Sequence, residues 1–148
     1  MSEIVTSFAD AVTPDGEEPY FCFCATLRIF GDIGDLEAIG RKLDLQPTRM
    51  YRKGERKRPW RADVWPRDGW MYQPPVDESR PLEEHIMALW DRLRPHIDFL
   101  KALKERCQVD IFCGYRSNSG TAGFEVSHRC LGLFIELEVS FGVSVIIA

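Results

Sequence analysis

The stretch that decides the fold lies near the C-terminus and begins Val109-Asp110-Ile111-Phe112-Cys113-Gly114-Tyr115. Its apolar side chains stand at alternate positions, which is the pattern of a strand with one buried face. The Ser-, Asn- and Gly-rich residues 116–123 predict a turn, and residues 124–127 after it predict a short second strand. Ser127 is a favoured N-cap residue, so we expect a helix to begin there and to bury Leu131, Phe134 and Leu137.

Upstream of this stretch, strand and helix patterns alternate. Residues 20–30 place Phe21, Phe23, Ala25, Leu27 and Ile29 on one apolar face. Residues 35–43 predict a short helix, and residues 49–52 and 70–72 predict two strands. An apolar helical stripe runs from Pro81 to about Cys107, and we expect a kink at Pro95, because proline removes a backbone donor. The alternating residues 141–147 predict a last strand.

This order of elements predicts an α+β fold. Strand-helix-strand-strand-helix-strand is the ferredoxin-like βαββαβ core, here extended by a further strand-helix-strand. We expect the helices to cover one face of a mainly antiparallel sheet. Residues 1–18, which end in a turn-rich acidic run, are expected to form a loose N-terminal arm, and residues 19–148 a single domain.

Composition narrows the class of protein. The chain has 148 residues, 45% hydrophobic content and a formal net charge of −4, so it can bury a core of its own and is not a polyanion binder as a whole. The five cysteines are an odd set without a C-x-x-C pair. We see neither a signal peptide nor a membrane span, and therefore expect a cytoplasmic protein with reduced thiols and no membrane partner.

The sheet face opposite the helices is expected to form a shallow trough. Its residues are mostly small, and Asp110 and Arg116 add charge: Cys22, Cys24, Thr26, Gly114, Gly142 and Ser144. Either the Trp-rich segment 60–72 folds over this trough, or the trough receives a ligand or a partner.

The strongest functional candidate is the basic segment 49–70. Residues 49–61 hold seven Lys or Arg against the single acid Glu55, a net charge of +6. The candidate binding residues are Arg52, Lys53, Arg56, Lys57, Arg58, Trp60, Trp65 and Trp70. Cations interleaved with aromatic rings are typical of protein interfaces and of single-strand nucleic-acid binding. The third interpretation is a solvated loop with its tryptophans turned inward.

No residues form a recognisable catalytic, metal or cofactor site. Cys22 and Cys24 lack further zinc ligands at a usual spacing, and no histidine lies in a metal motif. A nucleophilic pair of Cys113 with a histidine depends on geometry alone. Asp110 and Glu125 flank the expected hairpin and would do acid–base chemistry if they met, unless one of them pairs with Arg28 or Arg116.

Several short motifs, in this order, resemble the largely bacterial family known as domain of unknown function 4279. They are Thr26 to Gly31, Leu45 to Thr48, Tyr51 to Glu55, Gly69-Trp70, Pro81 to His85, Val109 to Cys113 and Gly123 to Glu125. One departure is Leu137-Glu138-Val139, where such sequences tend to have a Leu-Gly turn. The resemblance implies a compact α+β domain and brings no catalytic residues with it.

Together these observations favour a non-catalytic cytoplasmic domain that binds another protein. Nucleic-acid binding through residues 49–70 is the alternative, and a small-ligand site on the open sheet face is the third possibility. The sequence leaves the partner and the oligomeric state open.

Overall fold

Two long antiparallel strands form the centre of the sheet. In the computed structural model, which describes residues 16–148, β1 (Phe21–Gly31) pairs over its whole length with β4 (Cys107–Ser117). Buried and half-buried side chains alternate along β1 as far as Ile29. The alternation in the sequence therefore becomes one face toward the core and one away from it. Residues 1–15, most of the predicted arm 1–18, lie outside the described residues.

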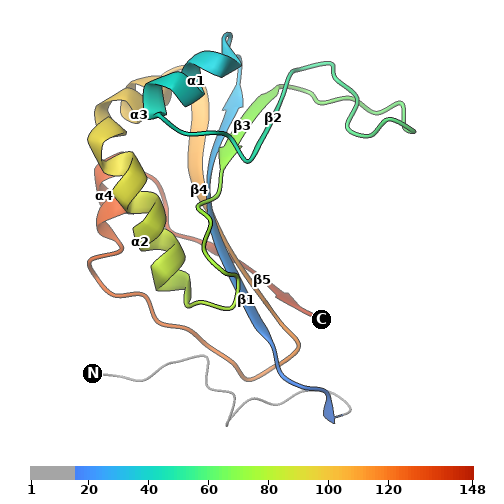
Figure 1. The fold of residues 1–148 in the computed structure, drawn as a ribbon, viewed down its shortest axis with the longest axis vertical. Helices are drawn as coiled ribbons and strands as arrows, with labels where there is room; N and C mark the ends of the chain where they lie inside the picture. Colours follow the sequence, from blue (N-terminus) through green and yellow to red (C-terminus); the bar gives the residue numbers. More distant parts are fainter. Residues whose placement is uncertain (1–15) are drawn as a thin grey trace.

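Three shorter strands complete a five-stranded sheet of order β2-β3-β1-β4-β5 (Figure 1). They are β2 (Arg49–Tyr51), β3 (Asp68–Tyr72) and β5 (Val143–Ile147). The β4–β5 pair is parallel and the other three pairs are antiparallel. The fold is therefore of mixed α+β class with a mainly antiparallel sheet, as predicted.

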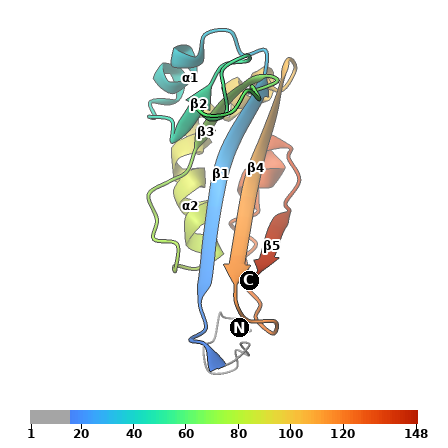
Figure 2. The same ribbon diagram turned by 90° about the vertical axis from the view of Figure 1, so that its right-hand side faces the viewer.

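The helices lie on one face of this sheet and leave the other face uncovered (Figures 1 and 2). They are α1 (Leu36–Leu43), α2 (Leu82–Leu93), α3 (Ile97–Leu103) and α4 (Gly132–Leu137). The side chain of Asp35 caps α1 by accepting a hydrogen bond from the amide of Ala38 at 3.2 Å.

Pro95 breaks the long helical stripe, as the sequence predicts. A 3-10 turn, η3 (Arg94–His96), separates α2 from α3. Pro95 lacks the N–H that a continuous helix needs at this position, so the chain tightens here before α3 starts. Apolar residues before and after the break still reach one core.

The core lies between the helices and the odd-numbered face of β1. Its largest side chains are completely buried, among them Leu27, Trp70, Ile86, Leu89, Leu93 and Leu100. Apolar burial contributes about 25 cal/mol per Å², so this layer holds the fold together. None of the helices within residues 16–148 is long and apolar enough to cross a membrane.

The C-terminal region departs from the sequence-based expectation in two ways. Residues 124–127 form no strand; Phe124 packs its ring against Phe23 and Tyr115 at centroid distances of 6.1 and 5.7 Å. Ser127 does not cap α4, which begins at Gly132 with Leu131 as its N-cap. The amide of Ser127 instead donates to the Glu83 carboxylate at 2.8 Å, which ties this segment to α2. Tertiary contacts thus override the local turn and cap signals.

Candidate functional site

The uncovered side of the sheet, the open face, carries the even-numbered side chains of β1 and β4. Within it lies a trough of about 300 Å³ where Cys24 faces Gly114 across the two strands. A Cβ at position 114 would come within 2.9 Å of the Cys24 sulfur, so glycine allows the thiol to pack closely against β4. No residue of 60–72 lines the trough. Of the two alternatives left open by the sequence, covering of the trough by this segment is not what the structure shows, although Arg67 of the segment lies over Phe30 on the same face, 4.4 Å from its ring centroid.

The thiols of Cys24, in the trough, and of Cys113, on the core side of β4, are poor nucleophiles. Burial raises the pKa of Cys24. Burial, with a smaller contribution from Cys24, raises the pKa of Cys113 to about 12. Since the thiolate is the reactive form, neither cysteine is activated near neutral pH. All five cysteines are free thiols, and no group of three or more His, Cys, Asp or Glu within residues 16–148 is placed to hold a metal ion.

An ion pair closes the end of the open face nearest β2 and β3. Arg28 donates from Nε and Nη2 to the two carboxylate oxygens of Asp110, at 2.7 and 3.0 Å. The expected pairing of a carboxylate with Arg28 is confirmed. Glu125 lies in the irregular segment after β4. The prediction that Asp110 and Glu125 stand on neighbouring strands is therefore wrong.

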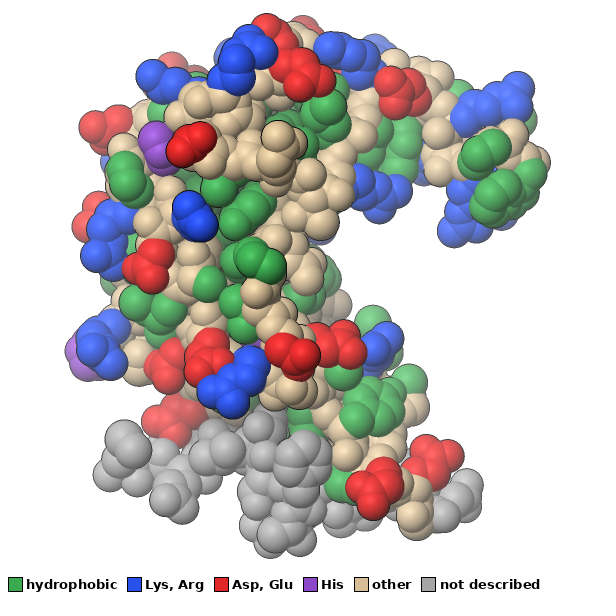
Figure 3. Space-filling view, in the orientation of Figure 1, with side chains coloured by type: hydrophobic (Ala, Val, Ile, Leu, Met, Phe, Trp, Pro, Cys, Tyr) green, Lys and Arg blue, Asp and Glu red, His purple; other side chains and the backbone are tan. Residues whose placement is uncertain are grey.

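Beyond the sheet, β2 and β3 continue as a ribbon that we call the basic hairpin, residues 52–67. The amide of Gly54 donates to the carbonyl of Trp65 and the amide of Trp65 donates to the carbonyl of Glu55, both at 2.9 Å. A further bridge joins Arg56 to Val64. The hairpin projects from the edge of the sheet, and in the space-filling view its Lys- and Arg-rich arm overhangs a deep notch (Figures 1 and 3).

Asp68 anchors the base of the basic hairpin. Its carboxylate accepts from the amide of Lys53 at 2.9 Å and from the amide of Ile33 at 3.2 Å. The bond from Lys53, followed by those from Ile33 and Gly34, holds the pKa of Asp68 below its usual value, although burial opposes this shift. One buried side chain thus ties the hairpin to the turn between β1 and α1.

An aromatic stack stiffens the hairpin next to this anchor. The rings of Tyr51 and Trp65 lie parallel, with centroids 3.7 Å apart and planes 10° apart. Gly69 faces Tyr51 across the strands, and a Cβ there would come within 2.6 Å of the Tyr51 hydroxyl. The guanidinium of Arg49 and the ammonium of Lys57 lie 4.9 and 5.2 Å from the Trp65 ring centroid. The hairpin therefore has an ordered aromatic floor with cations held over it.

The structure separates the predicted binding residues into surface and core. Five of the cations are exposed, namely Arg52, Lys53, Arg56, Lys57 and Arg58. Trp60 is 77% exposed at the turn of the hairpin, and Trp65 is half-buried in the stack. Trp70 is fully buried on the helix side and belongs to the core.

Sequence reasoning missed Asp68, because the two residues whose amides it accepts from lie 15 and 35 positions away along the chain. It also missed Arg49 and Tyr51 as parts of the aromatic floor. The available signal was the position of Arg49 and Tyr51 on one face of a predicted strand, followed by a segment that can return beside it at Trp65.

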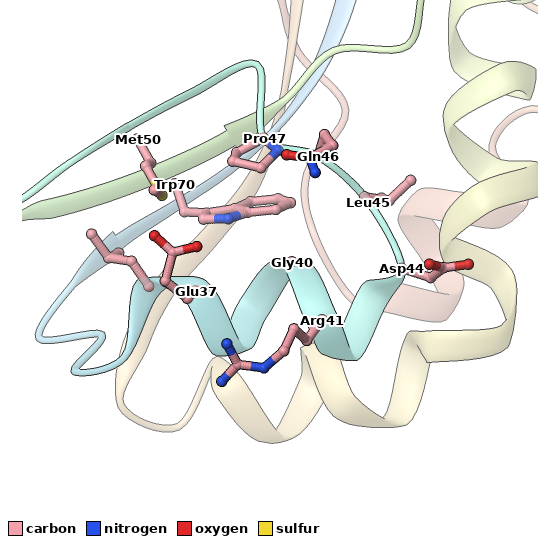
Figure 4. Close-up of a pocket in the computed structure, with 10 residues that line it drawn as sticks. Glu37, Gly40, Arg41, Asp44, Leu45, Gln46, Pro47, Met50 and Trp70 are labelled. Atoms are coloured by element: carbon pink, nitrogen blue, oxygen red, sulfur yellow. The ribbon is translucent and has the colours of Figure 1, made fainter.

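A second cavity, of about 280 Å³, lies between α1 and the β2–β3 edge (Figure 4). Pro47, Met50 and the Trp70 indole form apolar walls, and Glu37 and Arg41 stand at α1. The buried indole N–H of Trp70 has no hydrogen-bond partner within the described part of the chain. The guanidinium of Arg41 pairs with the carboxylate of Asp35, 3.2 Å away, and points away from the Trp70 indole. The cavity is suited to a small, partly apolar group.

The comparisons with known proteins give a family and no activity. The sequence matches the family described as Domain of unknown function (DUF4279) over residues 19–147. No curated protein matches it, and no solved structure matches it. Because the match covers nearly the whole chain, the resemblance seen in the sequence is confirmed, and the chain belongs to the DUF4279 family.

Proposed function

We propose that this protein is a non-catalytic domain that binds another protein through its basic hairpin. The observation that carries the proposal is Trp60, a large apolar side chain that is 77% exposed at the turn of an ordered ribbon. Tryptophan buries some 150–250 Å² in an interface, so covering the exposed part of Trp60 would contribute about 3–5 kcal/mol before the costs of association. Tryptophan and arginine are the residues most enriched at such energetic centres.

Charge separation supports the same proposal. The basic hairpin has seven Lys or Arg and two acids, a net charge of +5, on a chain whose overall charge is −4. A positive arm attracts a partner with an acidic surface, and the acidic body repels the same partner, so the encounter is directed to the arm. The preferred partner therefore has an apolar pocket bordered by Asp or Glu.

The test compares variants that leave the fold intact. Native partners are captured on the full chain and identified by mass spectrometry, and binding is then measured with the purified pair. Trp60→Ala is expected to weaken binding at least about 30-fold, which corresponds to a loss of 2 kcal/mol or more. The matched control is Ile135→Ala, since Ile135 is 73% exposed on α4, on the helix side of the sheet.

Charge reversal provides a second measurement. Arg56→Glu/Lys57→Glu/Arg58→Glu should leave the melting temperature nearly unchanged, because exposed charges contribute little to stability, and should remove binding. Unfolding of this variant would show that the hairpin is structural. Unchanged binding to every captured partner would leave the hairpin a solvated loop and refute the proposal.

Nucleic-acid binding is the second candidate, because Trp60 stands between Arg58 and Arg61 in one turn, where a ring can stack on a base while cations hold phosphates. It predicts oligonucleotide binding whose affinity falls steeply with salt. A small ligand in the trough of the open face is a third and weaker candidate, supported by the trough volume alone.

Two finer assignments belong to the proposal. We place the core among the ferredoxin-like folds, because the βαββαβ order and the arrangement β2-β3-β1-β4 support it. We place the protein in the cytoplasm of a bacterium. The five free thiols support a reducing compartment.

A further inference from the structure

Four cations converge on a hollow at one side of the basic hairpin. The hollow has a volume of about 380 Å³ and is lined by Arg49, Lys57, Arg58, Arg61, Asp63 and Trp65. Arg49 comes from β2 and the others from the two arms and the turn of the hairpin. The hollow is thus assembled by the fold from both sides of a ribbon.

Most of this positive charge is not neutralised. Asp63 is the single acid of the hollow, and it pairs with Arg61 at 3.4 Å. Within residues 16–148, Arg49, Lys57 and Arg58 take part in no salt bridge. Arg49 and Lys57 lie over the Trp65 ring, and a ring quadrupole attracts a cation without cancelling its charge. Three positive charges therefore remain available to an anion.

The cations are held in place by ordered neighbours. The Tyr51–Trp65 stack fixes the floor. The amide of Lys57 donates to the carbonyl of Asp63 at 3.1 Å, and the amide of Arg61 donates to the carbonyl of Arg58 at 3.2 Å. Like charges so close together repel one another, and an anion that joins them removes this repulsion. A site with its backbone already ordered loses little entropy when it binds.

We propose that this hollow binds a phosphate monoester on a phosphorylated serine or threonine of the partner protein. This inference rests on the function proposed above. A phosphate monoester carries a charge of about −1.5 to −2 at pH 7 and has three acceptor oxygens. The planar guanidinium groups of Arg49 and Arg58 match pairs of such oxygens, and the ammonium of Lys57 serves as a point charge. A carboxylate has one charge and two oxygens, and leaves cations of this hollow unsatisfied.

The position of Trp60 fits such a peptide. Trp60 lies in the same turn as Arg58 and Arg61, whose backbones are hydrogen-bonded to each other. A chain with its phosphate in the hollow would bring its neighbouring residues to this exposed indole. An apolar residue next to the phosphorylated one is therefore expected to strengthen binding.

The experiment uses the full chain and three matched short peptides that contain phosphoserine, serine or glutamate at one position. Binding is followed by backbone amide NMR shifts at residues 57–63 and by calorimetry. The phosphoserine peptide is expected to bind at least 10-fold more tightly than the other two, and more tightly above pH 6 than below it, where the phosphate takes up a proton. Equal affinity for the glutamate peptide would overturn the proposal.

A pair of double variants separates the site from general charge. Lys57→Ala/Arg58→Ala should weaken phosphopeptide binding at least 10-fold. Arg92→Ala/Arg129→Ala removes the same charge from exposed positions outside the hairpin, and should weaken it less than about 3-fold. Melting temperatures establish that both variants fold. Equal losses in the two variants, or tighter binding of a single-stranded oligonucleotide of equal charge, would overturn the proposal.

Phosphatase treatment of a captured partner distinguishes a failure of the phosphate site from a failure of the proposed protein binding. If binding survives complete dephosphorylation, the phosphate site is wrong and protein binding stands. If Trp60→Ala and the triple charge reversal leave capture intact, both proposals fail together.

Discussion

Replacing Asp68 should loosen the basic hairpin and lower the stability of the whole domain. Asp68→Ala removes the acceptor of the amides of Lys53 and Ile33. A hydrogen bond to a charged group contributes about 1.5–3 kcal/mol, and a buried donor left unpaired costs about 1–3 kcal/mol. Ile33 is buried, so its amide bears this cost, whereas water can reach Lys53. We therefore expect a loss of about 2–4 kcal/mol in the free energy of unfolding.

The dependence of this loss on pH follows from the lowered pKa of the Asp68 carboxyl. A group whose pKa is lower in the folded state stabilises the fold above its unfolded pKa, about 3.9 for aspartate, and this contribution is lost as pH falls through the folded pKa. The difference between the natural protein and Asp68→Ala should be constant from pH 8 to 5 and should shrink below about pH 4.

This effect is measured by urea unfolding, with tryptophan fluorescence as the signal. We expect the urea concentration at the midpoint to fall while the slope m stays unchanged. Asp91→Ala is the control, because Asp91 is an exposed carboxylate on α2, and its loss should change stability by less than about 0.5 kcal/mol. Asp68→Asn keeps one acceptor oxygen and should fall between the two. A loss below about 0.5 kcal/mol for Asp68→Ala, or one that does not change with pH, would refute the anchoring role.

Three further predictions concern the core and the thiols. Gly69→Ala should destabilise the protein by about 1–3 kcal/mol in the same unfolding assay, because the new Cβ meets the Tyr51 ring. Gly120→Ala is the control and should have little effect, because its Cβ would have nothing within 4 Å. Equal effects of the two substitutions would contradict the close packing at Gly69. His85 is fully buried and burial lowers its pKa, so its neutral form stabilises the fold above the unfolded pKa of about 6.5, and this contribution should decline as pH falls from 7 to 5.5. His85→Leu should flatten that decline and exposed His128→Gln should not; a decline unchanged in His85→Leu would assign it to other groups. Iodoacetamide at pH 8 should leave Cys113 and Cys130 unmodified in the native protein and modify both after unfolding, because both are buried and have raised pKa values. Labelling is read by mass spectrometry. Rapid labelling of Cys113 in the native protein would contradict its burial and show that the sheet opens there.

Periodicity predicted the elements that face a single core. The strict alternation of residues 20–30 became β1, and the apolar stripe around Pro95 became α2 and α3 with a break between them. These patterns succeed because the signal is repeated several times within one element. The exposure of the cations and the burial of Trp70 agree with the cost of desolvating charge and the gain from burying an indole.

Local signals failed where distant residues decided the outcome. Phe124 lies against rings of β1 and β4 rather than in a strand, and Ser127 bonds to Glu83 rather than capping α4. The hollow of the hairpin was equally hidden, because Arg49 and Trp65 are separated by a ribbon whose pairing register the sequence does not state. The basic composition predicted that charge gathers here, and the fold alone determines which cations meet.

The projection of the basic hairpin from the sheet has an evolutionary consequence. The described contacts that join it to the rest of the domain are concentrated at its base, where Arg52, Lys53 and Arg67 bond to Gly34, Asp68 and Gln108. Selection for folding therefore acts strongly at that base and weakly along the arm, where substitutions are nearly neutral for stability. Descendants of such a chain can exchange the arm for another sequence while keeping the same scaffold, as binding loops do on rigid frameworks. The arm can then diversify within a lineage without a new fold having to arise.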